Sequence, residues 1–319
     1  MPTTAKILIT PRALTRDGHP ALDQLRAAGY TLVFCNAGQT PSEAELMQLV
    51  PDCVGWLAGV EPVSVAVAEA ARSLKAVSRN GTGTDNLPVE AFKQKGVAIL
   101  RAEGANARGV AELAITLMLS AMRHVPTIDA GMKAGNWLRL LGREIDGRAI
   151  AIIGYGRIGS EVAKMACGLG ARVRAYDPFV IQPVRPLGDF AWHHDLDLLN
   201  GADVVSLHAP GRSDGQPLLG AVELACLAPG AVVVNTARAS LVSADAMLDA
   251  LGSGQIGVYA TDVFEQEPPL PSPLLAHPNV IRTSHIGGYT DESVTRATTT
   301  AVANLLRTLG PAHNSHLAK

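Results

Sequence analysis

Residues 148–159 read RAIAIIGYGRIG, and this stretch decides the fold. The apolar run at residues 148–153 predicts a strand that is buried on both faces, and the helical pattern SEVAKMA follows at residues 160–166. Between them, the spacing Gly-x-Gly-x-x-Gly is typical of the turn that binds a dinucleotide in a Rossmann fold. The glycine spacing is a weak signal by itself, so the preceding strand and the following helix carry the prediction.

Each glycine of this fingerprint has its own physical task. Gly154 allows the tight turn, Gly156 lets a pyrophosphate approach the backbone, and Gly159 lets the helix pack closely on the strand. The free N–H groups at the helix N-terminus then bind the phosphates. The next strand ends in Asp177, where a carboxylate accepts hydrogen bonds from the adenosine ribose and repels a 2′-phosphate. The predicted cofactor is therefore NAD, although Arg157 argues weakly against this choice because it can also reach toward a phosphate.

Short β-rich runs alternate with helical patterns along the whole chain, in two series, and the second series starts at the fingerprint strand. Alternating strands and helices imply parallel sheets that are covered by helices on both faces. We therefore predict an α/β protein with two doubly wound parallel-sheet domains. A Rossmann NAD domain (residues 101–285) is inserted into a flavodoxin-like substrate domain (residues 1–100 plus 286–319). A helical pattern at residues 291–309 predicts that the chain ends on the first domain.

The composition is that of an ordinary globular protein. Of 319 residues, 18% are charged and 47% hydrophobic, and the net charge is -2 with acids and bases mixed along the chain. This pattern favours neither a nucleic-acid partner nor a membrane surface. The N-terminus lacks the pattern of a signal peptide, and the four cysteines, at positions 35, 53, 167 and 226, lack metal-ligand spacing. We expect a cytoplasmic protein with no bound metal, whose partner is a small molecule.

An arginine, a glutamate and a histidine follow the fingerprint in an order that fits hydride transfer to or from a 2-oxo acid. Arg238 is always charged, and its forked donors can bind a carboxylate and polarise the neighbouring carbonyl group. A histidine such as His285 suits the transfer of a proton to or from the substrate oxygen. A carboxylate beside that histidine fixes its tautomer and favours its protonated form. We assign this role to Glu267 rather than to the nearby Glu265.

Together these motifs resemble the D-2-hydroxyacid dehydrogenase family, and within it the phosphoglycerate-dehydrogenase-like members. The resemblance covers nearly the whole chain and includes EIDGR at 144–148, HAP at 208–210, NTAR at 235–238, DVF at 262–264 and HIGG at 285–288. It favours Glu267 as the partner of the histidine, because Glu267 lies five positions after Asp262 and precedes a proline, as in the family. With the fingerprint, the resemblance implies a cofactor-binding set that comprises Gly154, Gly156, Arg157, Ile158, Gly159, Asp177, Pro210, Thr236, Ala237, Arg238, Asp262 and Gly287.

The segment RNGTGTDN at residues 79–86 is similar to the substrate loop of this family. Its backbone N–H groups are expected to bind the 2-carboxylate, while Arg79 and Arg108 are candidates for binding a second anionic group; alternatively, Arg108 faces solvent or a neighbouring subunit. The expected substrate-binding set is Arg79, Asn80, Gly81, Thr82, Gly83 and Arg108. The segment AGVE at residues 58–61 lacks the arginine that phosphoglycerate-specific relatives tend to have, which makes 3-phosphoglycerate a doubtful substrate.

The helix expected at residues 109–123 bears on assembly. It is apolar nearly all round, and Glu112, Thr116 and Ser120 make one narrow polar stripe. A single domain core does not cover so wide an apolar surface, so we expect a second surface on this helix and a homodimer built on the NAD domain. The alternative is a helix that is buried between the two domains.

Two other functions compete with a dehydrogenase. The first is an NAD(H)-binding regulatory protein on the same scaffold, which would keep similar residues. The second is a different enzyme with a glycine-rich Rossmann site, such as a methyltransferase, and it would leave Arg238, Glu267 and His285 unexplained. The chain ends soon after its last predicted helix, so we expect no C-terminal regulatory domain.

Overall fold

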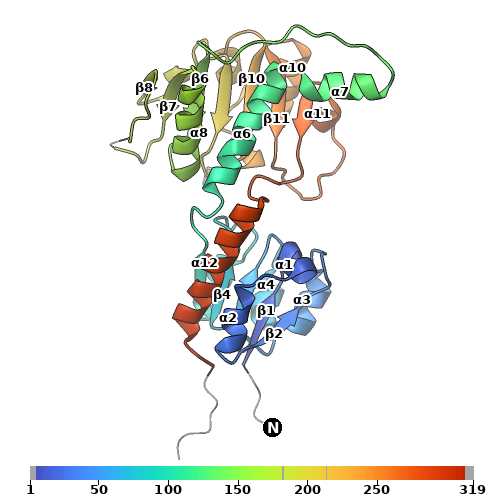
Figure 1. Cartoon of the computed structure of the whole chain (residues 1–319), viewed down its shortest axis with the longest axis vertical. Coiled ribbons are helices and arrows are strands. Elements are labelled where there is room, and N and C mark those ends of the chain that lie inside the picture. Colours follow the sequence, from blue (N-terminus) through green and yellow to red (C-terminus); the bar gives the residue numbers. More distant parts are fainter. Residues whose placement is uncertain (1–4, 182, 213, 313–319) are drawn as a thin grey trace, which may run out of the picture. The chain divides into compact units, whose positions relative to one another are not determined.

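The computed structural model describes residues 5–181, 183–212 and 214–312 (Figure 1). The chain divides into two compact units, one made of residues 1–106 with 290–319 and the other of residues 107–289. The predicted boundaries lay a few residues earlier, after residues 100 and 285. Residues 102–106 stay with the first unit because Ala102 and Ala105 pack against Ala297. Among the described residues, no helix is long and apolar enough to cross a bilayer.

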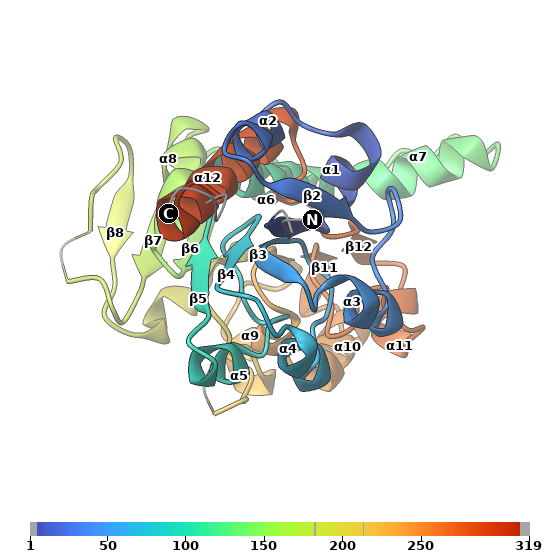
Figure 2. The same cartoon turned by 90° about the horizontal axis from the view of Figure 1, so that it is seen from below.

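The first unit is built on a five-stranded parallel sheet with the strand order β2-β1-β3-β4-β5. The strands are β1 (Lys6–Ile9), β2 (Thr31–Phe34), β3 (Cys53–Ala58), β4 (Ala76–Arg79) and β5 (Ala98–Arg101). The helices are α1 (Arg12–Asp17), α2 (Leu22–Ala27), α3 (Glu43–Leu49), α4 (Val65–Ala70), α5 (Val89–Gln94) and α12 (Asp291–Leu309). Figure 2 shows α2 and α12 over one face of the sheet and α3, α4 and α5 over the other.

The last helix, α12, belongs to the core of this first unit. It begins at the cap Thr290, whose side chain accepts a hydrogen bond from the backbone N–H of Ser293. Leu305 is fully buried, and a side chain at Gly55 of β3 would lie only 2.8 Å from Leu309. The tyrosine hydroxyl of Tyr30 donates to the carbonyl of Gly310 at 2.7 Å. The C-terminal helix therefore covers the sheet that the N-terminal strands form.

The second unit is built on a seven-stranded parallel sheet with the strand order β12-β11-β10-β9-β6-β7-β8. The strands are β6 (Ala149–Ile153), β7 (Arg172–Tyr176), β8 (Phe190–Trp192), β9 (Val204–Leu207), β10 (Ala231–Asn235), β11 (Ile256–Thr261) and β12 (Val280–Arg282). The main helices are α6 (Ala107–Met122), α7 (Val125–Lys133), α8 (Arg157–Gly168), α9 (Ala221–Ala225), α10 (Ala244–Gly252) and α11 (Pro273–Ala276).

Both faces of the second sheet are covered, which explains its apolar strands. Ile150 and Ile152 of β6 pack under α6 and α8, whereas Ala151 and Ile153 of the same strand pack on the opposite side with residues of α10. Because successive side chains of a strand point to opposite faces, every position of such a strand must be apolar. The sequence predicted six of these strands and missed β8, which has only three residues.

Candidate active site

The fingerprint turn links β6 to α8 and has the shape that a dinucleotide requires. Gly154 has a positive φ of 90°, and a side chain there would lie 2.5 Å from the backbone of His208. At Gly159, a Cβ atom would lie 1.9 Å from the carbonyl oxygen of Gly154. A Cβ atom on Gly156 would meet nothing within 4 Å, so open space lies above the N-terminus of α8. This open space fits the approach of a pyrophosphate to the helix N-terminus.

Asp177 is held beside this turn, directly after β7. Its carboxylate accepts hydrogen bonds from the backbone N–H of Tyr155 at 2.8 Å and from that of Phe179 at 2.9 Å. These contacts fix the acidic group next to the fingerprint, where lone pairs of each oxygen remain for a ribose hydroxyl. The arrangement suits NAD and disfavours a 2′-phosphate.

The loop after β10 presents Arg238. The buried side chain of Asn235 clamps this loop, because its amide donates to the carbonyl of Arg238 at 2.9 Å and its oxygen accepts from the backbone N–H of Ala237 at 3.1 Å. Within the described part of the chain, the buried hydroxyl of Thr236 has no hydrogen-bond partner, which is the condition expected of a group that meets a cofactor. Thr236 and Ala237 were predicted at the cofactor, whereas the two hydrogen bonds by which Asn235 holds this loop were not predicted.

His285 and Glu267 form a hydrogen-bonded pair in the second unit. Nδ1 of His285 lies 2.8 Å from each carboxylate oxygen of Glu267, and their side chains are 45% and 33% exposed. Because an ionised carboxylate only accepts hydrogen bonds, Nδ1 carries the proton and Nε2 is the ring nitrogen that remains for a substrate. Glu267 also accepts a hydrogen bond from the backbone N–H of Phe264 at 3.3 Å, which orients the carboxylate.

Asp262 anchors the turn that carries His285. Its fully buried carboxylate accepts from the hydroxyl of Thr283 at 2.6 Å and from the backbone N–H groups of Ile286 and Gly287, both at 2.8 Å. His285 itself has a positive φ of 55°, which is an unfavourable conformation for a residue with a side chain. Three hydrogen bonds to one buried carboxylate offset that strain. Asp262 was predicted at the nicotinamide end of the cofactor, with a cap at the end of the strand as the alternative, and its hydrogen bonds to the turn that carries His285 are contacts that the sequence does not show.

His208 is partly buried and lies against the fingerprint turn, with Nε2 2.9 Å from the hydroxyl of Ser206. Desolvation lowers the pKa of His208 to about 3, so the ring is neutral at physiological pH. Among the described residues, its Nδ1 is one of the few buried side-chain atoms without a hydrogen-bond partner. Atoms of His208 lie against Gly154 and Gly159, so this residue supports the backbone of the fingerprint turn.

The residues predicted to bind substrate divide between the two units. Those of the loop at residues 79–86 lie in the first unit, where the hydroxyl of Thr82 donates to the side-chain oxygen of Asn106 at 3.4 Å. Arg108 lies in the second unit and is exposed. It forms ion pairs with Glu112 at 2.6 Å and with Glu161 at 3.2 Å. The two carboxylates already compensate the charge of Arg108. This supports the alternative that Arg108 faces solvent, and it argues against a role in binding a second anionic group of the substrate.

The fold and this site define an NAD-binding oxidoreductase, and the comparisons with known proteins specify its family. The model of the D-isomer specific 2-hydroxyacid dehydrogenase NAD-binding domain matches residues 115–287. A hydroxypyruvate reductase from Thermotoga maritima is 35% identical over 274 residues, which are 83% of this chain and 88% of the relative. The chain belongs to the D-isomer-specific 2-hydroxyacid dehydrogenase family and is an NAD-dependent oxidoreductase of 2-hydroxy acids.

Two further matches show how far the similarity extends. A D-3-phosphoglycerate dehydrogenase from Methanocaldococcus jannaschii is 37% identical over 246 residues, which are 76% of this chain and 47% of that relative. The chain therefore spans about half the length of this phosphoglycerate dehydrogenase. The crystal structure of a glyoxylate reductase from Paecilomyes thermophila is 26% identical in sequence and superposes with a TM-score of 0.83. The match covers 97% of this chain and 96% of the glyoxylate reductase chain. The family membership favours an enzyme over an NAD(H)-binding regulatory protein.

Proposed function

We propose that this dehydrogenase interconverts a small 2-oxo acid and the corresponding D-2-hydroxy acid, with Arg238 binding the carboxylate and carbonyl and His285 transferring the proton. The observation that carries the assignment is the 2.8 Å pair of His285 and Glu267, because it leaves Nε2 of the imidazole for the substrate. Backbone N–H groups at residues 81–83 are proposed to bind the 2-carboxylate. The hydroxypyruvate reductase and glyoxylate reductase relatives support acids of two or three carbons.

The division of labour follows from the charges. When bound, NADH supplies the hydride to the carbonyl carbon. Arg238 places its positive charge beside the carbonyl oxygen, where negative charge develops as the C=O double bond becomes a single bond. His285 releases its Nε2 proton to that oxygen, so the product is a neutral hydroxyl group. Glu267 stabilises the imidazolium before transfer, and the same steps run in reverse for oxidation of the hydroxy acid.

The test is an assay of NADH oxidation with a panel of 2-oxo acids, in the parent and in three variants. His285→Ala should lower kcat by about 10²–10⁴-fold if proton transfer limits the rate. Arg238→Ala should raise KM and lower kcat together. Arg238→Lys should keep only part of the parent kcat/KM, because lysine lacks the planar fork of donors. A parent protein that binds NADH but reduces none of the acids would contradict the proposed function.

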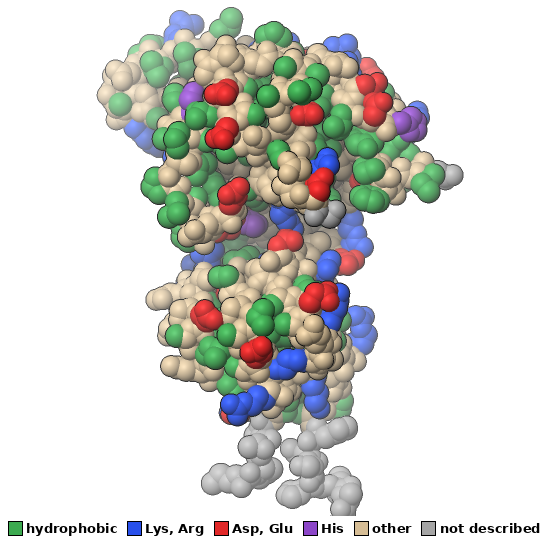
Figure 3. Space-filling model, turned by 180° about the vertical axis from the view of Figure 1, so that it is seen from behind, with side chains coloured by type: hydrophobic (Ala, Val, Ile, Leu, Met, Phe, Trp, Pro, Cys, Tyr) green, Lys and Arg blue, Asp and Glu red, His purple; other side chains and the backbone are tan. Residues whose placement is uncertain are grey.

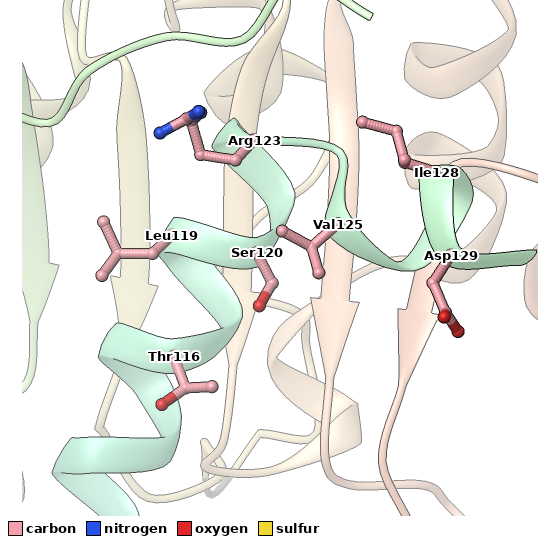
Figure 4. A pocket seen from close by; sticks show the side chains of 7 residues that line it. All are labelled: Thr116, Leu119, Ser120, Arg123, Val125, Ile128 and Asp129. Carbon is pink, nitrogen blue, oxygen red and sulfur yellow. The ribbon is translucent and has the colours of Figure 1, made fainter. Parts of the chain in front are cut away.

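We also propose a homodimer that is built on the second unit. A shallow groove of about 620 Å³ lies along α6 and α7, as Figure 4 shows, and is lined by Thr116, Leu119, Ser120, Arg123, Val125, Ile128 and Asp129. The segment that follows α7 exposes large apolar side chains, of which Trp137 is 78% and Leu141 96% exposed. Exposed large apolar side chains are enriched at interfaces, and two-fold dimers are the commonest soluble oligomers. A second copy of the chain is the proposed occupant.

The proposed location is the cytoplasm, and the proposed partner is a small acid rather than a nucleic acid or a membrane. On the face drawn in Figure 3, acidic and basic side chains are scattered among one another. Nucleic-acid-binding proteins instead gather lysine and arginine on one face. Within the described part of the chain, no cluster of three or more histidine, cysteine, aspartate or glutamate side chains could hold a metal ion.

A further inference from the structure

Asn86 ends the segment RNGTGTDN and joins two loops that follow neighbouring strands of the first sheet. This substrate loop begins at Arg79, the last residue of β4, whereas a turn at residues 59–61 follows β3. Because β3 and β4 pair in parallel, both loops leave the sheet at the same edge. In open α/β sheets, ligands bind outside this edge, at the carboxyl ends of the strands. Asn86 was not among the substrate-binding residues expected from the sequence, and its contacts are found only in the folded chain.

The amide nitrogen of Asn86 binds the turn that follows β3. It donates to the backbone carbonyl oxygen of Glu61 at 2.6 Å and to that of Gly59 at 3.3 Å. The backbones of the two segments also pair at this place, since the N–H group of Val63 donates to the carbonyl oxygen of Asn86 at 2.9 Å. Hydrogen bonds of both the side chain and the backbone therefore tie the end of the substrate loop to the neighbouring turn.

The turn to which Asn86 binds is itself held in place. The backbone N–H group of Gly59 donates to Oε1 of the buried Glu61 at 3.0 Å, and the hydroxyl of Thr10 donates to the same oxygen. The direction at Thr10 is fixed, because the indole N–H group of Trp56 can only donate and does so to this hydroxyl at 2.9 Å. The two carbonyl groups that accept from Asn86 thus belong to a well-supported turn.

The amide oxygen of Asn86 contacts the other end of the substrate loop. It accepts a hydrogen bond from Nε of the buried Arg79 at 3.3 Å. The guanidinium group lies against the loop backbone, because a Cβ atom at Gly81 would lie 3.3 Å from Nη1 of Arg79. The backbone N–H group of Ala102, directly after β5, donates to the carbonyl oxygens of Arg79 at 3.2 Å and of Gly81 at 3.0 Å. The start of the loop is thus held on two sides, by Ala102 and by the guanidinium group that Asn86 orients.

From these contacts we infer that Asn86 positions the substrate loop to bind the 2-carboxylate of the acid. It acts through the loop backbone and through Arg79, so it is a positioning residue and not a catalytic one. A loop whose N–H donors are already in place loses less conformational freedom when the acid binds. Asn86 therefore lowers KM for the acid and leaves the hydride and proton transfers unaffected. The inference rests on the proposed function, in which the N–H groups at residues 81–83 bind this carboxylate.

The test measures KM and kcat of Asn86→Ala with the 2-oxo acid that the parent reduces best. Losing the side-chain hydrogen bonds should raise KM by about tenfold, while kcat stays within about threefold of the parent. The dissociation constant of oxamate, an unreactive analogue of a 2-oxo acid, from the enzyme–NADH complex should rise by the same factor because it reports binding alone. Asn36→Ala is the matched control, since it removes an exposed asparagine of the same unit, and it should leave all three constants unchanged.

A second variant, Asn86→Asp, keeps the size of the side chain and an acceptor for Arg79 but has no N–H donor for the turn after β3. It should also raise both KM and the oxamate constant. Combining Asn86→Ala with Arg79→Gln should raise KM by less than the product of the two single effects, because both changes release the same loop.

The affinity for NADH, measured by fluorescence, should stay at the parent value in each variant because the fingerprint lies in the other unit. A parent KM and oxamate constant in either Asn86 variant overturns the inference, and so does a lower kcat at an unchanged KM. Independent effects of Asn86→Ala and Arg79→Gln overturn the route through Arg79. A parent that binds NADH and oxamate but reduces none of the acids overturns the proposed function instead, and the oxamate constants then still decide the role of Asn86.

Discussion

Nδ1 of His285 is equidistant, at 2.8 Å, from the two carboxylate oxygens of Glu267. The pair is local to one unit, although its members are separated by 17 intervening residues in the sequence, because both follow strands at the same edge of the second sheet. A half-exposed pair of this geometry can exchange protons with substrate and solvent while it keeps the ring in one orientation.

Replacing Glu267 by glutamine should lower kcat for reduction. Glutamine can still accept a hydrogen bond from Nδ1 of His285, but it carries no charge to stabilise the imidazolium that donates the proton to a 2-oxo acid. We expect kcat to fall by about tenfold or more while KM for the acid stays near the parent value. The measurement is steady-state kinetics of Glu267→Gln beside the exposed control Glu265→Gln, which should keep the parent kcat. A parent kcat in Glu267→Gln would show that Glu267 is not the functional partner.

Asp177→Ala should erode the preference for NADH over NADPH. The parent carboxylate repels a 2′-phosphate, and its removal abolishes that repulsion along with the acceptor for the ribose hydroxyls. We expect the ratio of kcat/KM for the two cofactors to fall by about tenfold or more, in line with the loss of one charge interaction. The matched control is Asp249→Ala at an exposed position of α10. Equal efficiency of both cofactors in the unaltered protein would contradict the assignment.

His208 should make the protein less stable as the pH falls. Its folded pKa of about 3 is far below the ordinary value of 6.5, so between these pH values the unfolded chain takes up a proton that the folded chain does not. The stabilising effect of the neutral ring is complete above pH 6.5 and is lost at about 1.4 kcal/mol per pH unit on acidification. His208→Gln should flatten the decline of Tm between about pH 6.5 and 4.5, above the range where most carboxylates titrate.

The control for that experiment is His194→Gln, which removes an exposed histidine. It should leave the slope of Tm against pH unchanged. If His208→Gln kept the full parent slope, another group would have to account for the acid sensitivity.

The proposed dimer predicts that a charge in the groove of α6 and α7 weakens self-association. Val125 lines this groove and is exposed in the single chain, so Val125→Asp would place a carboxylate in the proposed apolar interface. Light scattering should report about twice the chain mass of 33.3 kDa for the parent and a mass close to that of one chain for the variant at micromolar concentration. Val222→Asp makes the same change on α9 and should leave the mass unaltered. A monomeric parent would refute the dimer.

Much of the fold could be predicted from the sequence because strands buried on both faces leave an unmistakable apolar pattern. The two parallel-sheet domains were predicted in this way and are confirmed. Strand β8 was missed since three edge residues contain too little periodicity to detect. The domain boundaries shifted by several residues because Ala102 and Ala105 are retained by a contact with Ala297, nearly two hundred positions away in the sequence.

At the site, the order and spacing of the motifs predict the reactive side chains, whereas the contacts that orient them are visible only in the structure. Arg238, Glu267 and His285 are predicted because their order has a chemical meaning. Asn235 and Asp262 lie within quoted motifs, but their hydrogen bonds to the loops that carry Arg238 and His285 could not be predicted. A buried polar side chain acquires such partners only when the folded chain brings them within hydrogen-bond distance.

The second unit occupies one uninterrupted stretch of the chain, residues 107–289, whereas the first is assembled from both flanks. All the residues that are proposed to transfer the proton and bind the cofactor are therefore encoded in one continuous segment of the gene. The loop that is proposed to bind the substrate carboxylate is encoded outside this segment. Recombination at residues 106/107 and 289/290 would combine one hydride-transfer domain with different substrate domains, so that substrate specificity can change while the catalytic residues stay the same.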